Sequence, residues 1–122
     1  MPEYIKRLQM ADEYYFKEGC HIIEVSNSEH DEAVSIARAR VEAGVVTRWH
    51  CVLDTYERYI ITSGTGVVEV GEQPPTEVGS GDVVLIPPGT RQRIRNTGDS
   101  DLVFLAVCSP RFKAENYREL TN

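Results

Sequence analysis

Four side chains near the middle of the sequence have the types and spacing needed for proton transfer or ligand binding. Alternate residues of an extended chain share a face, so Arg48 and His50 share one face of the strand predicted over residues 45–53. Glu57 and Tyr59 share a face of the next predicted strand, over residues 57–62. An inward Glu57 carboxylate needs a partner, which Arg48, His50 or a metal ion would supply. We therefore predict Glu57, Tyr59 and Arg48 as candidate catalytic residues.

Arg48 and Tyr59 also suggest ligand binding. Arg48, His50 and Tyr59 each have a purely structural explanation as well. An inward arginine binds a carboxylate or phosphate through two parallel hydrogen bonds, and Tyr59 is a candidate for stacking or proton transfer. Alternatively, Arg48 forms a salt bridge with Glu57 or Glu42, His50 bonds to Glu57 or a tyrosine, and Tyr59 packs in the core. Cys51 lies on the opposite face and is not proposed as a nucleophile.

Short strands, punctuated by glycine and proline, must position these side chains. The β-branched stretch 20–26 predicts a first strand, and strict alternation over residues 33–43 predicts a long second one. Further strands are predicted at 45–53, 57–62, 67–71, 76–78, 83–86, 91–95 and 102–108. Without a convincing amphipathic helix, the pattern favours an all-β sandwich or jelly-roll barrel.

Length and composition restrict the class of protein. The 122 residues are enough for one domain, which we divide into an arm (1–19), a barrel (20–110) and a tail (111–122). A net charge of -6 argues against nucleic acid as a partner. No apolar run reaches the roughly 18 residues of a membrane span, and no signal peptide is evident, so we expect a cytoplasmic protein. Three widely spaced cysteines predict buried or half-buried thiols rather than a disulfide framework.

Two short motifs frame the central hairpin. The first contains Gly44, His50, Val52, Glu57 and Gly64, and the second contains Gly81, Pro87, Gly89, Gln92 and Asn96. With this spacing, residues 33–109 resemble the cupin superfamily, whose motifs run Gly, His-x-His, Glu, Gly and then Gly, Pro-x-Gly, His, Asn. The resemblance implies a single-domain double-stranded β-helix, the cupin jelly-roll barrel. Val52 and Gln92 stand where the family has its second and third histidines.

The resemblance also implies a divalent-metal site. In the family the three histidines and the glutamate hold the ion, so the matching positions here are His50, Glu57 and Gln92. A glutamine offers only a neutral oxygen, so the site would be weak, and manganese, iron, nickel and zinc all remain open. The alternative for Gln92 is a polar strand residue whose amide bonds the backbone.

The nearest resemblance is to small stand-alone cupins described as sugar-phosphate or mannose-6-phosphate isomerase-like. It implies a metal-dependent isomerase acting on a carbohydrate or anionic substrate, in which the metal polarises an oxygen while an acid/base group moves a proton. One alternative is a metal-free cupin that binds a small ligand as a sensor or storage module. Another is a metal-dependent cyclase or lyase of secondary metabolism. The resemblance and the aromatic residues of the arm together predict a homodimer.

Overall fold

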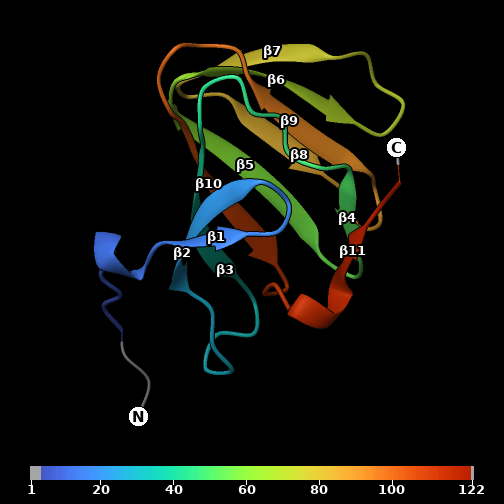
Figure 1. Cartoon of the computed structure of the whole chain (residues 1–122). Helices are drawn as coiled ribbons and strands as arrows, with labels where there is room; N and C mark the ends of the chain where they lie inside the picture. Colours follow the sequence, from blue (N-terminus) through green and yellow to red (C-terminus); the bar gives the residue numbers. More distant parts are fainter. Residues whose placement is uncertain (1–3, 122) are drawn as a thin grey trace.

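The computed structural model describes residues 4–121 as two antiparallel sheets that face each other (Figure 1). One sheet has the order β1-β2-β3-β10-β5-β8 and the other the order β11-β4-β9-β6-β7. The strands are β1 Tyr14–Phe16, β2 Cys20–Ser26, β3 Ser35–Val41, β4 His50–Val52, β5 Tyr56–Ser63, β6 Thr65–Val70, β7 Thr76–Gly79, β8 Val83–Ile86, β9 Gln92–Asn96, β10 Leu102–Ser109 and β11 Tyr117–Glu119. Two short 3-10 turns, Met10–Asp12 and Ala114–Asn116, are the only helical elements described. The predicted single-domain, all-β jelly roll is confirmed.

The core lies between the two sheets. The rings of Tyr59 and Phe104 pack with centroids 4.2 Å apart, and Ile94 faces them from the second sheet. The alternation read from residues 33–43 is confirmed for β3, where Ala39 and Val41 are buried. All three cysteines are free and buried, as predicted. Side chains from both sheets thus pack into one apolar core.

The strand predicted over residues 45–53 is confirmed only for β4. Before it, the Thr47 hydroxyl accepts a hydrogen bond from the Ile94 backbone N–H (2.9 Å), so a side chain takes the place of a regular ladder contact. The next backbone N–H, of Arg48, donates to the Glu18 carbonyl (2.7 Å). Because this stretch is irregular, alternation fails there, and Arg48 is exposed while His50 is buried.

Both segments that flank the predicted barrel contribute strands. β1 pairs with β2, and β11 pairs with β4. The chain before β1 extends away from the barrel (Figure 1), and its apolar side chains Tyr4, Ile5, Leu8 and Met10 are exposed. No helix among the described residues has the length and hydrophobicity to traverse a lipid bilayer.

Candidate functional site

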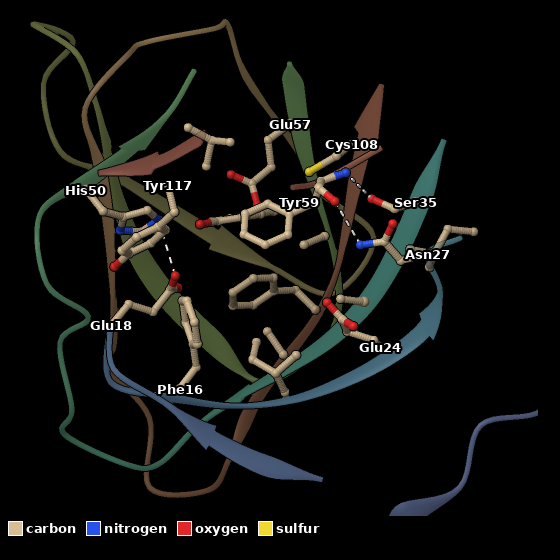
Figure 2. Close-up of a pocket in the computed structure, with 18 of the residues that line it drawn as sticks. Phe16, Glu18, Glu24, Asn27, Ser35, His50, Glu57, Tyr59, Cys108 and Tyr117 are labelled. Carbon is tan, nitrogen blue, oxygen red and sulfur yellow. Dashed lines mark hydrogen bonds and ion pairs between the residues drawn. The ribbon is translucent and has the colours of Figure 1, made fainter. Parts of the chain in front are cut away.

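A cavity opens on the inner face of the larger sheet and reaches β4 and β11 (Figure 2). The volume that water-sized groups can occupy in it is about 70 Å³. Small-molecule sites usually have volumes of roughly 300–1,000 Å³, so this cavity is small for such a site. His50, Glu57 and Tyr59 all line the cavity, so the structure brings together three of the residues singled out from the sequence.

His50 comes from β4, and its ring orientation is fixed from two sides. Its Nδ1 lies 2.8 Å from the Arg48 carbonyl oxygen. A carbonyl only accepts, so Nδ1 carries a proton, and in the neutral ring Nε2 holds the lone pair. The Tyr117 ring stacks on the imidazole, with centroids 5.3 Å apart and planes at 22°. Nε2 lies 3.6 Å from Oε1 of Glu18, which also lines the cavity.

Glu57 comes from β5 and is part of a chain of side-chain hydrogen bonds. The Gln92 amide N–H donates to Glu57 Oε1 (3.0 Å), while the Gln92 amide oxygen accepts the Tyr59 hydroxyl proton. All three side chains are buried, with Glu57 9% exposed. This chain holds one carboxylate oxygen and leaves the second free of a protein hydrogen bond within the described residues.

The surroundings of Glu57 favour its protonated form. Burial raises the pKa of this carboxyl from 4.5 to about 7, and the nearby Glu18 carboxylate adds to the rise. His50 and the bond from Gln92 act in the opposite direction without cancelling it. With a pKa of about 7, Glu57 is present in both protonation states at neutral pH, which suits a group that gives and takes protons.

Two cysteine thiols near the site, those of Cys108 and Cys20, have raised pKa values. Burial raises the pKa of Cys108, which lines the cavity, to about 12, and burial together with Glu18 raises that of Cys20 further. A thiol is nucleophilic only as thiolate. Neither cysteine therefore supplies a nucleophile at neutral pH.

The metal site implied by the family resemblance requires three donors aimed at one point. Gln92 directs its amide N–H toward Glu57, and its oxygen is already bonded to the Tyr59 hydroxyl. Within residues 4–121, no three His, Cys, Asp or Glu side chains are grouped closely enough to hold an ion. Of the three predicted donors, only His50 and Glu57 keep a donor atom free of a side-chain hydrogen bond, so this set does not fit a three-donor metal centre, and we assign no step to a metal.

Arg48, predicted to share an inward face with His50, lies outside the cavity. Its side chain is exposed and donates to the Lys17 carbonyl oxygen (2.7 Å). The irregular backbone before β4 is the physical reason, because it breaks the alternation on which the prediction relied. A direct contact between Arg48 and a bound ligand is not supported by this position.

Two residues of the site were not predicted from the sequence. Glu18 lies in the turn between β1 and β2, and Tyr117 begins β11. Neither belongs to a motif. Backbone contacts place both residues at the site: the Arg48 N–H donates to the Glu18 carbonyl oxygen, and Tyr117 pairs with Val52. These contacts join segments about 30 and 65 residues apart in sequence, so no local sequence pattern predicts them.

Comparison with known proteins gives a family and several structural relatives. A model of the cupin domain matches residues 37–108. The uncharacterized protein MJ1618 of Methanocaldococcus jannaschii is 31% identical over 105 residues, which cover 84% of this chain and 83% of that protein. An oxalate-binding protein of Thermotoga maritima is 35% identical over 79 residues, 64% of each chain.

Among solved structures, Pac13, described as a unique nucleoside dehydratase, superimposes with a TM-score of 0.77. The match covers 98% of this chain and 92% of Pac13 at 19% identity, so the likeness is one of fold. Streptomyces Pac13 has also been solved with uridine, as tyrosine-to-phenylalanine and histidine-to-glutamine variants. Glu18 and Tyr117 both lie outside the segment that matches the cupin model.

Proposed function

We propose that this chain, which belongs to the cupin family, is a small-molecule enzyme that eliminates water by general acid–base catalysis. The observation that carries the proposal is the pair formed by His50 and Glu57 at one end of the cavity. His50 presents an Nε2 lone pair there because Nδ1 is bonded to a backbone carbonyl. Glu57 is a buried carboxyl with a pKa of about 7. The imidazole lone pair can accept a proton and the protonated carboxyl can donate one, which are the two roles that general acid–base catalysis needs.

The reaction needs two proton transfers and no other reagent. Nε2 of His50 takes a proton from a carbon, and the protonated carboxyl of Glu57 gives its proton to a hydroxyl on the adjacent carbon. The C–O bond breaks, the electrons of the C–H bond form a carbon–carbon double bond, and water leaves. The Glu18 carboxylate, 3.6 Å from Nε2, stabilises the imidazolium that results. Returning that proton to Glu57 restores the site.

Water elimination agrees better with this site than the isomerase predicted from the sequence. An isomerase of that type uses the same proton transfers but also a metal that polarises a carbonyl. Here the Gln92 amide directs its N–H, not its oxygen, toward Glu57. The likeness to a nucleoside dehydratase is one of fold, and a dehydration on such a barrel is compatible with the proposal. The two side chains named above, rather than that likeness, are the basis of the proposal.

A direct assay tests the proposal. The purified protein is treated with a chelator, incubated with uridine and a panel of other hydroxylated small molecules, and assayed by mass spectrometry for a product lighter by one water. We expect turnover in the wild type and its loss in His50→Gln and in Glu57→Gln. Glu77→Gln, an exposed carboxylate change on β7, is the matched control and retains turnover. Circular dichroism checks that each variant is folded.

Three results would overturn the proposal. Turnover that persists in both site variants would show that other groups do the chemistry. Tight binding of panel members without loss of water would favour the metal-free ligand-binding alternative. Metal content near one equivalent, lost in both His50→Ala and Glu57→Ala and required for turnover, would favour the metal-dependent site.

A further inference from the structure

The strand register places four cavity-lining residues in one row across the larger sheet. Glu24 on β2 lies opposite Ala37 on β3, Ala37 lies opposite Ala106 on β10, and Ala106 lies opposite Tyr59 on β5. All four line the cavity. Cross-strand partners point to the same face of a sheet, so the row runs along the cavity wall. With a strand spacing of about 4.8 Å, its two ends are about 14 Å apart.

The two central residues of this row have small side chains, which leaves a depression in the cavity wall. Ala37 and Ala106, which we call the alanine floor, occupy inner-face positions where core strands ordinarily carry larger apolar side chains. Both are only half-buried and line the cavity. The neighbouring row carries Phe104 and Ile22, which are larger and limit the floor on one side. A flat ring fits such a depression between bulkier neighbours better than a branched group does.

The ionisable groups that line the cavity are acidic, apart from His50. Among the described residues, three carboxyl groups line it, from Glu18, Glu24 and the partly protonated Glu57, whereas no lysine or arginine does. The cavity is therefore unfavourable for a phosphate or carboxylate group, since like charges in a partly desolvated site repel strongly. The cavity therefore differs from enzyme sites that bind their substrate through a phosphate or carboxylate group.

The end of the row near Glu24 has one polar group available to a ligand. Asn27 donates to the Phe112 carbonyl oxygen (2.9 Å), and the Ser35 hydroxyl accepts the Phe112 backbone N–H (2.8 Å). Those two polar side chains are therefore used to anchor the chain after β10. Glu24 is exposed at the same end, where Figure 2 shows it beside Asn27. A carboxylate accepts hydrogen bonds from N–H or O–H groups.

We propose that the cavity selects an uncharged or cationic ligand whose flat ring lies on the alanine floor, with a hydroxylated part beside His50 and Glu57 and a hydrogen-bond donor directed to Glu24. The orientation of the hydroxylated part rests on the proposed function. The ring site and the charge selection rest on the row and the carboxylates alone. The substrate class is therefore a ring-bearing, hydroxylated molecule without phosphate or carboxylate.

A binding experiment that needs no turnover tests this. Ligand-observed NMR is recorded with a fragment library sorted into anionic, neutral and cationic ring compounds, with uridine and uridine 5′-monophosphate as a matched pair. We expect neutral and cationic rings to bind, and the monophosphate to bind at least about tenfold more weakly than uridine. Ala106→Leu fills the floor and abolishes ring binding, whereas Ala43→Leu, an exposed position after β3, leaves it unchanged. Glu24→Lys admits anionic fragments.

Each outcome decides the matter. Hits enriched in anionic compounds, equal binding of uridine and its monophosphate, or a library without neutral or cationic hits would overturn the charge selection. Ring binding that survives in Ala106→Leu would overturn the alanine floor, and Ala37→Val repeats that test if Ala106→Leu does not fold. Selective ring binding without any dehydration would leave this inference standing while the proposed function fails.

Discussion

The buried carboxyl of Glu57 gives a prediction about stability that can be worked out in advance. Its pKa is about 7 in the folded protein and near 4.5 when unfolded. The folded state therefore holds this proton more tightly, and unfolding releases it between these two pH values. A group of this kind lowers stability as pH rises through the window and has no effect below it. At about 1.4 kcal/mol per tenfold change, the loss is on the order of 3 kcal/mol by pH 8.

Replacing Glu57 with glutamine removes this pH dependence. The glutamine side chain is nearly the same size and still accepts the hydrogen bond from Gln92. We expect Glu57→Gln to match the wild type near pH 4.5 and to exceed it at pH 8 by up to about 3 kcal/mol.

Urea unfolding of both proteins at several pH values, with a chelator present, gives the difference in free energy of unfolding directly. Titrating groups that do not interact with Glu57 cancel in that difference, whereas Glu18 and His50 are coupled to it. Glu77→Gln, an exposed change, serves as the control and should show no trend. A difference between the wild type and Glu57→Gln that stays constant from pH 5 to pH 8 would refute the reasoning.

Three further predictions concern the core, a turn and the assembly. Tyr59→Phe leaves the buried amide oxygen of Gln92 without its donor and should cost about 1–3 kcal/mol in urea unfolding. Gly64→Ala should lower the melting temperature far more than Gly81→Ala: both have positive φ, but a Cβ at Gly64 would lie 2.7 Å from a backbone oxygen, and one at Gly81 meets nothing within 4 Å. The exposed apolar arm predicts a homodimer that becomes monomeric when residues 1–12 are deleted, measured by light scattering.

These three predictions fail in different ways. Unchanged stability in Tyr59→Phe would show that water or another donor serves the amide oxygen. Equal melting temperatures for the two glycine variants would show that the chain near β10 moves aside at little cost. A full-length protein that is monomeric at all concentrations would leave the exposed side chains of the arm, such as Tyr4 at 87% exposure, without the partner we expect.

Much of the fold follows from local patterns in the sequence. The bounds of β2 and β8 agree with the prediction residue for residue, because a β-branched run and an apolar run are each closed by turn-forming residues. The strand predicted over residues 45–53 was too long, since only β4 is observed. Alternation continues in the sequence before β4, but there the Thr47 side chain replaces a ladder contact. A local pattern predicts the tendency to form a strand, but it does not reveal where a side-chain hydrogen bond replaces a backbone one.

For the site, the sequence indicated through its resemblance to the two cupin motifs that His50, Glu57 and Gln92 lie together, and strand pairing places His50 opposite Gln92. Only the tertiary structure decided the rest. It turned Arg48 outward, turned the Gln92 amide toward Tyr59, and brought Glu18 and Tyr117 from the two ends of the chain to His50. Those contacts depend on hydrogen bonds and strand pairs between distant segments, and their energies are not written in any local stretch of sequence.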